Sequence, residues 1–318
     1  MDGVAKTPRR WRGAAWLLFL ALAVVEVVGH VVVRARVVDE PDWEAAAARV
    51  RRDFREGDLV VVAPEWADPI LRLHLGDVIS LEAAGRSDLS RYERLWALSI
   101  RGHLPPEAPA GAPELDEQVG RVRVLRWTLR PDRILYDFVE HVEDARVTMV
   151  QGGREIPCPW RNDGRARGGG LGAGPIVPAA RHVCDPRRPW LWVGATMQDD
   201  LDLRPRWCVW QHPAGPEPIR TTFDDVPLGE RVVLYADLYY EHERDREHGP
   251  VHVAVRVDGE EIGRMIHADG DGWKRLEAST QRPGGPRRER GRVSIEVSAP
   301  DPHLRTICWA ATTRGEAE

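Results

Sequence analysis

The chain has almost no lysine and lacks the short motifs that mark several common enzyme classes. Of its 45 basic residues only Lys6 and Lys274 are lysines, and the formal net charge is -5. This charge offers no basic surface for DNA or RNA. No G-x-S-x-G, H-E-x-x-H or Walker A motif is present, so acyl transfer, zinc proteolysis and ATP hydrolysis lose their usual local signals. We therefore expect no nucleic-acid partner and interpret the chain as non-catalytic.

Cysteine is also scarce, and none of the cysteines has the C-x-x-C spacing of zinc or redox sites. All lie in the second half of the chain: Cys158, Cys184, Cys208 and Cys308. In an oxidising compartment we expect one or two disulfides. Four cysteines allow three pairings, and their spacing does not choose among them.

One long apolar run, GAAWLLFLALAVVEVVGHVVV, covers residues 13–33. At about 1.5 Å per residue it can cross roughly 30 Å of hydrocarbon, which predicts a transmembrane helix over residues 13–36. Basic residues precede the run and acidic residues follow it, so the positive-inside rule places residues 1–12 in the cytoplasm. The remaining chain is then extracytoplasmic, in the periplasm or at the cell surface. A cleaved signal peptide, with Ala14 to Val25 as its apolar region, is the alternative.

Two ionisable residues interrupt the apolar run. Glu26 and His30 are four residues apart, and therefore lie on one face of the predicted helix. An ionisable group inside a membrane costs roughly 2.5 to 3.5 kcal/mol on insertion scales. We expect the two either to pair with each other or to contact a partner membrane protein.

Residues 40–128 predict a small α/β domain. An Ala-rich helix over residues 44–56 is followed by a buried strand, 59–63, and by a helix over 66–75. A second buried strand covers 95–100, and after a proline-rich loop residues 121–129 alternate as a third strand. This alternation of helix and strand favours a small parallel sheet.

Part of this region resembles a known family. The segments GDLVVVAPEWADPILRLHLGD and RYERLWALSIRG are similar to the extracytoplasmic tail of membrane glycosyltransferases that use polyprenyl-phosphate sugars. The resemblance implies a role beside such an enzyme, as an interaction or accessory subunit. In that family an acidic pair after the first membrane helix takes part in catalysis, and Asp39 and Glu40 occupy a comparable position.

Residues 130–318 read as a β-sandwich, because short alternating strands with turn residues dominate. In the clearest hairpin the valines at 251, 253, 255 and 257 face one side, and Asp258-Gly259 provides a type I′ turn into residues 260–267. About eight to ten strands are expected, as in a jelly roll. The complete chain is thus predicted to be α+β, mainly β, with one N-terminal transmembrane helix.

The end of this region resembles galactose-binding-like jelly-roll modules, on the pair Gly272-Trp273 and the final strand containing Cys308. Such modules often bind sugars through loop aromatics and sometimes hold a structural calcium, so the resemblance implies an envelope carbohydrate as ligand.

Candidate ligand-binding residues lie next to predicted turns. The chain has 13 Trp against four Phe, and an exposed Trp160 or Trp273 would offer a platform for a sugar ring. His267, Asp269 and Asp271, in HADGDG, could supply oxygen ligands to calcium, but Asp-Gly is also what tight turns use. We therefore expect no cofactor and no metal.

The favoured function is that of a membrane-anchored extracytoplasmic binding protein for envelope carbohydrate. One alternative is an accessory subunit that contacts a membrane glycosyltransferase through Glu26, His30 and the α/β domain. The other is a glycoside hydrolase, which would need two carboxylates roughly 5 to 9.5 Å apart.

Overall fold

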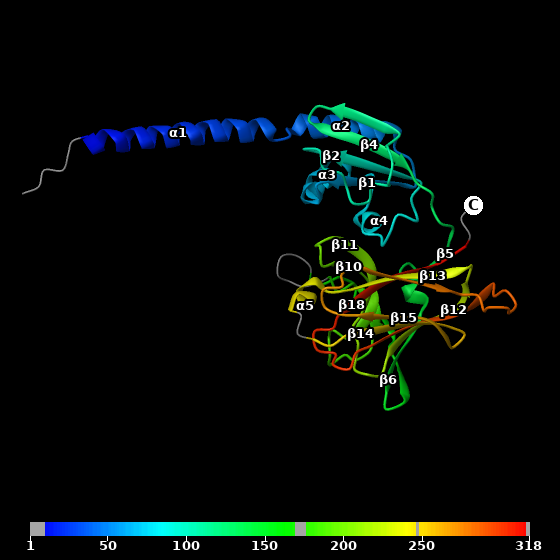
Figure 1. Cartoon of the computed structure of the whole chain (residues 1–318). Coiled ribbons are helices and arrows are strands. Elements are labelled where there is room, and N and C mark those ends of the chain that lie inside the picture. Colours follow the sequence, from blue (N-terminus) through cyan, green and yellow to red (C-terminus); the bar gives the residue numbers. More distant parts are fainter. Residues whose placement is uncertain (1–9, 169–175, 246–247, 316–318) are drawn as a thin grey trace, which may run out of the picture.

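The structure is a computed structural model that describes residues 10–168, 176–245 and 248–315; the predicted cytoplasmic stub therefore lies largely outside the described residues. Helix α1 (Arg10–Arg36) extends away from the rest of the molecule (Figure 1). It is long and apolar enough to cross a membrane, by length and composition. Its side chains from Trp16 to Ala35, Glu26 and His30 included, are exposed. Only three residues separate α1 from the next helix.

An α/β unit, residues 40–128, follows directly. Its four strands form a sheet in the order β1-β2-β4-β3. Helix α2 packs on β4 and α3, and α3 packs on β1, so that one core forms between helices and sheet. The elements are α2 (Glu40–Asp53), β1 (Asp58–Ala63), η1 (Glu65–Ala67), α3 (Asp68–Leu75), α4 (Leu81–Ala84), β2 (Arg94–Ser99), β3 (Leu115–Val119) and β4 (Val122–Thr128).

The sheet of this unit is mixed, and the prediction of a parallel sheet was wrong beyond its first pair. β1 and β2 are parallel, whereas β2 and β3 both run antiparallel to β4. A parallel third strand needs a crossover, usually a helix, and residues 100–114 contain none. The chain instead forms a hairpin at Gly120, whose φ of 57° suits a tight turn.

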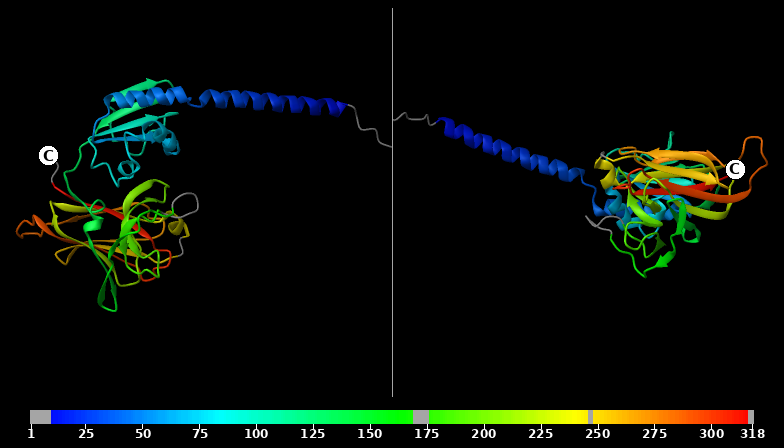
Figure 2. Two further views of the ribbon diagram at one scale, coloured as in Figure 1. Left: turned by 180° about the vertical axis from the view of Figure 1, so that it is seen from behind. Right: turned by 90° about the horizontal axis from the view of Figure 1, so that it is seen from below.

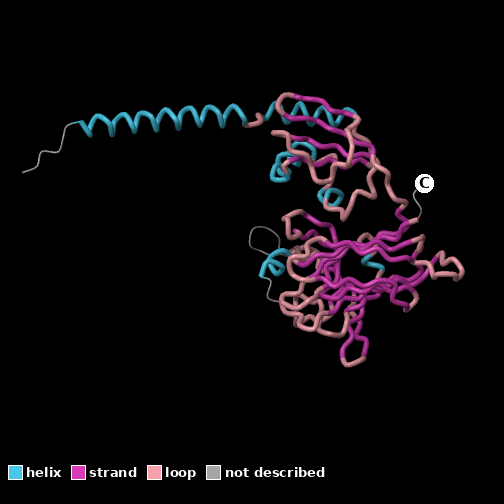
Figure 3. Tube along the Cα trace, viewed as in Figure 1, coloured by secondary structure: helices cyan, strands magenta, loops and turns pink. Residues whose placement is uncertain are grey.

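The remainder of the chain folds into two facing sheets with one core between them (Figures 1 and 2). The eight-stranded sheet has the order β16-β13-β18-β11-β10-β9-β8, with β5 paired to β18, and the six-stranded sheet has the order β15-β14-β17-β12-β6-β7. Figure 3 shows how little helix this part contains. The architecture confirms a mainly β, sandwich-like fold.

The bounds of its elements are β5 (Ile134–Asp137), η2 (Val142–Asp144), β6 (Arg146–Gln151), β7 (Arg154–Pro157), β8 (Trp160–Asn162), β9 (Ala180–Val183), β10 (Trp192–Asp199), β11 (Pro205–Gln211), β12 (Ile219–Pro227), β13 (Arg231–Leu238), α5 (Tyr240–Asp245), β14 (Val251–Val257), β15 (Glu260–His267), β16 (Lys274–Ser279), β17 (Arg290–Ser298) and β18 (Ile307–Arg314).

The β14–β15 hairpin matches its prediction. Val253, Val255 and Val257 are completely buried. The turn residues Asp258 and Gly259 have φ angles of 52° and 83°, the left-handed backbone that a type I′ turn requires. Alternation sets the register here because one face of the hairpin is buried in the core.

Two disulfides connect the sandwich internally, as the sequence predicted. Cys158 pairs with Cys184, and Cys208 pairs with Cys308. All four side chains belong to the sandwich core.

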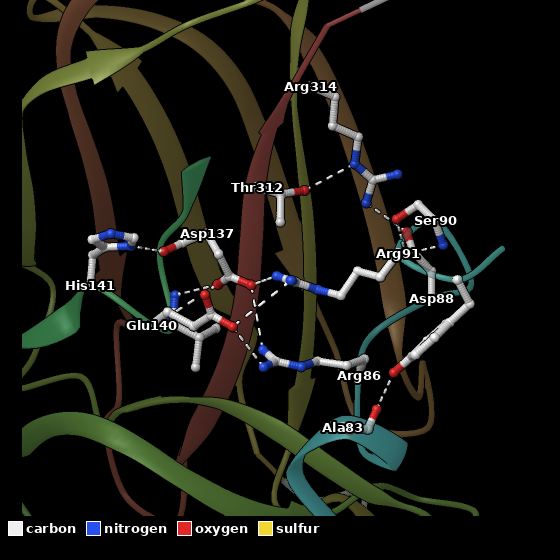
Figure 4. Close-up of polar contacts among 12 residues, drawn as sticks. Ala83, Arg86, Asp88, Ser90, Arg91, Asp137, Glu140, His141, Thr312 and Arg314 are labelled. Atoms are coloured by element: carbon white, nitrogen blue, oxygen red, sulfur yellow. Dashed lines mark hydrogen bonds and ion pairs between the residues drawn. The ribbon is translucent and has the colours of Figure 1, made fainter. Parts of the chain in front are cut away.

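The α/β unit and the sandwich meet through a charged contact (Figure 4). Arg86 and Arg91, from the loop before β2, both contact the Asp137 carboxylate at the end of β5. Arg86 Nη2 also donates to Glu140 at 2.8 Å. The Trp207 backbone N–H of β11 donates to the Gly85 carbonyl at 2.6 Å. These contacts hold the two parts in one orientation.

Candidate functional site

A large hollow lies on the outer face of the six-stranded sheet. It has a volume of about 510 Å³. Residues that alternate with the core positions of β6, β12, β14 and β17 line it, because neighbouring side chains in a strand point to opposite faces. The lining residues are Arg146, Glu155, Arg220, Thr222, Arg256, Asp258, Gly259, Arg292, Ser294 and Glu296.

Glu296 is at the centre of the hollow. Although it points outward from β17, it is only 8% exposed. Arg220 of β12 donates through Nε to Oε1 at 2.7 Å, and Arg256 of β14 donates through Nε to Oε2 at 3.0 Å. The Arg220 and Arg256 side chains therefore flank the Glu296 carboxylate at the bottom of the hollow. Beside it the hydroxyls of Thr222 and Ser294 are 3.0 Å apart.

A second hollow of about 500 Å³ continues the first. It is lined by Asp224, Asp225, Asp258, Arg290, Gly291 and Arg292. Because Asp258 and Arg292 line both hollows, the two form one feature, here named the polar groove. The Arg292 Nε donates to Asp224 at 2.5 Å, and this hydrogen bond raises the pKa of Arg292. The pKa of Asp225 is lowered by the hydrogen bond from Arg290.

The positive and negative side chains that line the polar groove are equal in number. Five arginines, at 146, 220, 256, 290 and 292, face five carboxylates, at 155, 224, 225, 258 and 296. The guanidiniums donate, the carboxylates accept, and the Thr222 and Ser294 hydroxyls do both. Such a surface can bind a neutral molecule that carries many hydroxyl groups. No aromatic side chain lines it.

Neither predicted tryptophan platform lines the groove. Trp160, in β8, is half-buried and packs edge-to-face on His182, with ring centroids 4.8 Å apart. Trp273 lies in the contact with the α/β unit, where it stacks on Tyr235 and its Nε1 donates to the Ser87 carbonyl at 3.4 Å. The Arg206 guanidinium covers this ring at 5.2 Å.

The three candidate residues of the HADGDG segment each contact a different partner. Asp269 accepts from Arg305 at 2.6 Å, and Asp271 accepts from Lys274 at 2.7 Å. His267 is buried instead and points toward Asp237, with Nε2 3.5 Å from Oδ1. The structure therefore does not bring the three predicted residues together around one point.

Two other tryptophans outside α1 are exposed. Trp66, which follows β1, is 60% exposed and lies under the Arg101 guanidinium at 5.8 Å. Trp190, just before β10, is 49% exposed. Sequence reasoning missed both as platforms, although Pro64 and Pro189 beside them signal loops.

Comparisons with known proteins found no matching family model and no matching curated protein. Solved structures that are similar include carbohydrate-binding modules of family 51. A CBM51-2 module of Clostridium perfringens ZmpB in complex with GlcNAc is 15% identical, with a TM-score of 0.30, over 39% of this chain and 26% of that one.

The module of Clostridium perfringens GH95 in complex with methyl-galactose is 8% identical, with a TM-score of 0.27, over 38% of this chain and 81% of that one. Tandem CBM51 modules of the family 98 glycoside hydrolase from Streptococcus pneumoniae are 10% identical, with a TM-score of 0.30, over 63% and 57% of the two chains. The similarity of residues 40–128 to glycosyltransferase tails finds no support in these comparisons and stays a prediction.

Proposed function

We propose that this chain is a membrane-anchored extracytoplasmic protein whose polar groove binds carbohydrate. The observation that carries this proposal is the groove itself: two adjoining hollows whose donors and acceptors are held in place by cross-strand pairs. Sugar hydroxyls both donate and accept, so they can be bound by guanidinium, carboxylate and hydroxyl groups together.

The charge balance of the groove favours a neutral glycan. Five guanidiniums and five carboxylates leave no net field to attract a strongly anionic polymer. Because the groove continues through two hollows, a chain of several sugar units fits it better than one terminal sugar. Recognition then rests on hydrogen bonds rather than on stacking against a ring.

Two features support the cellular location. Helix α1 meets the length and composition of a membrane span, and basic residues cluster before it in the sequence. The disulfides Cys158–Cys184 and Cys208–Cys308 belong to an oxidising compartment. Together they favour a cytoplasmic N-terminus and a folded part outside the membrane.

A glycan array with the full chain in detergent, labelled at one terminus, tests the proposal. The informative variant is Arg292→Ala, in the groove, and the matched control is Arg282→Ala. Both arginines are more than half exposed, and each pairs through Nε with one carboxylate, at 2.5 Å and 2.7 Å. They differ in that Arg282 lies outside the groove.

We expect selective binding of neutral oligosaccharides that falls at least tenfold in Arg292→Ala and is unchanged in Arg282→Ala. Trp190→Ala is the third arm. If binding disappears in Trp190→Ala and persists in Arg292→Ala, the ligand site is at the loop end of the sandwich and the groove assignment is wrong. If the array shows no binding at all, the carbohydrate function itself fails.

The accessory-subunit alternative rests on α1. Glu26 and His30 are exposed on it, and a bilayer would force them to find a partner. Crosslinking from position 26 or 30 in membranes that recovers a glycosyltransferase would favour this function over glycan binding alone.

A further inference from the structure

Three titratable side chains from separate elements meet at a buried point beside the sandwich core. Asp237 is next to the end of β13, Glu243 lies in α5, and His267 ends β15. None of the three is exposed. One ligand atom from each lies within 4.8 Å of the other two. We name this group the buried cluster.

Each residue of the buried cluster has one side-chain atom within hydrogen-bond distance of a backbone group. Asp237 Oδ2 accepts from the Leu201 N–H at 3.3 Å, and Glu243 Oε1 accepts from the Gly272 N–H at 2.8 Å. His267 Nε2 is 2.9 Å from the Gly272 carbonyl oxygen. The other oxygen of each carboxyl group, Asp237 Oδ1 and Glu243 Oε2, has no hydrogen-bond partner among the described residues. A buried polar atom without a partner costs roughly 1–3 kcal/mol.

Nearby basic side chains are already paired with other acids. The pairs are Arg305 with Asp269 at 2.6 Å, Lys274 with Asp271 at 2.7 Å, and Arg206 with Asp200 at 2.8 Å. Within the described residues, neither Asp237 nor Glu243 has an arginine or lysine partner. Two buried carboxyl groups this close must either keep a proton or hold a cation, because two bare negative charges repel each other.

The imidazole of His267 agrees with this. Its Nδ1 has no hydrogen-bond partner among the described residues, and a neutral ring keeps a lone pair on one nitrogen. A neutral imidazole is the form that binds metals.

We propose that Asp237, Glu243 and His267 bind one divalent transition-metal ion, with Zn²⁺ as the best match. Calcium takes six to eight oxygen ligands, whereas zinc takes four ligands that combine imidazole nitrogen with carboxylate oxygen. Ligand atoms around a tetrahedral zinc lie roughly 3.3 Å apart, and one ligand atom from each of the three residues already lies within 4.8 Å of the other two, so small side-chain rotations would bring them to that spacing. Because all three residues are buried, the ion is structural, and one enclosed water molecule supplies its fourth ligand.

Such an ion would connect α5 to the end of β15. Glu243 is the one member from a short helix of six residues, which packing alone holds weakly. The ion would therefore hold the segment between β13 and β14 against the sandwich.

The test uses the full chain purified in detergent, stripped with EDTA and then dialysed against Zn²⁺ or Ca²⁺. Metal content is measured by mass spectrometry and the thermal midpoint by scanning fluorimetry. The variant Asp237→Asn should fold, because an amide resembles the protonated carboxyl in shape. His303→Gln is the matched control: its ring lies 5.6 Å from that of His248, outside the cluster.

We expect one Zn²⁺ per chain, a higher thermal midpoint with Zn²⁺ than with EDTA, and at least tenfold weaker Zn²⁺ binding in Asp237→Asn but not in His303→Gln. Co²⁺ in the unmutated chain should give the visible absorption of a four-coordinate site, which keeps the test valid if a variant misfolds. Binding of Ca²⁺ in preference to Zn²⁺, or equal midpoints with and without Zn²⁺, would overturn the proposal.

Discussion

Arg314, the last residue of β18, holds Asp88 of the α/β unit: its Nη2 donates to Asp88 Oδ2 at 2.6 Å, while Nη1 donates to Asp132 at 2.9 Å. The Arg314 side chain is 3% exposed. Burial raises the pKa of Asp88, but the charge of Arg314 and the hydrogen bonds outweigh it, so the pKa is lowered overall. The Arg314–Asp88 pair therefore links the sandwich to the α/β unit, each of which has its own hydrophobic core.

Arg314→Ala should therefore lower the free energy of unfolding by about 3 kcal/mol, because it leaves Asp88 buried without its counter-charge. Urea unfolding measures the change. The exposed pair Arg282–Glu260 supplies the control, since Arg282→Ala should cost at most about 1 kcal/mol. Equal losses in the two variants would mean that the contact between the units contributes little.

The disulfides should differ in their contribution to stability. Cys208–Cys308 spans 100 residues and Cys158–Cys184 spans 26. Loop-closure entropy predicts losses of roughly 4.7 and 3.5 kcal/mol when each pair is replaced by serines. The two double variants are compared by urea unfolding. A larger loss for the shorter loop would show that packing around the sulfur atoms, rather than chain entropy, dominates.

Stability should fall in mild acid because of His212. Burial lowers its pKa to about 4 against the raising effect of a backbone hydrogen bond with Pro213, and the charges of His242, His303 and Arg188 add to the lowering; in an unfolded chain the pKa is about 6.5. The unfolded state therefore binds a proton first as the pH drops, and stability present above pH 6.5 is lost toward pH 4. The loss is about 3 kcal/mol from this group.

The measurement is the free energy of unfolding between pH 7 and pH 4 for the unmutated chain and for His212→Gln. The variant should show a shallower decline over this window. His103→Gln, at an exposed histidine of the α/β unit, should keep the original slope. Parallel curves for the unmutated chain and His212→Gln would contradict the assignment.

Anchoring by α1 predicts a simple fractionation result. The full chain should stay in the membrane pellet after alkaline carbonate extraction, and a chain starting at residue 37 should be released. A full-length chain found in the supernatant would mean that α1 does not span the bilayer, and a shortened chain there would mean that α1 is removed.

Much of the fold could be predicted from local patterns. The valines of β14 and the Asp258-Gly259 turn specify their hairpin because burial on one face admits one register. The β3–β4 hairpin was missed because β3, LDEQV, alternates between half-buried and exposed positions and resembles a polar loop. Nothing local showed that β4 would approach β2 in the antiparallel direction.

The polar groove could not be predicted because its residues look like ordinary surface positions. Arg220, Arg256 and Glu296 alternate with core residues on three strands, and only the sheet order places β17 between β12 and β14. The buried cluster left one signal: Asp237 interrupts the apolar strand RVVLYADL. Its partners Glu243 and His267 come from other elements, so the sequence alone could not assemble them.

A short connection and a group of ion pairs relate α1 to the rest of the molecule. Three residues join α1 to α2, and the ion pairs of Figure 4 link the α/β unit to the sandwich. α5 lies on the same side of the molecule as α1 (Figures 1 and 2), whereas the groove opens near the Asp258 turn, at the opposite end of β14. β14, with seven residues, spans roughly 24 Å. If α1 spans the membrane as proposed, the groove opens at the end of the sandwich away from the membrane helix, where it would meet a glycan above the bilayer surface.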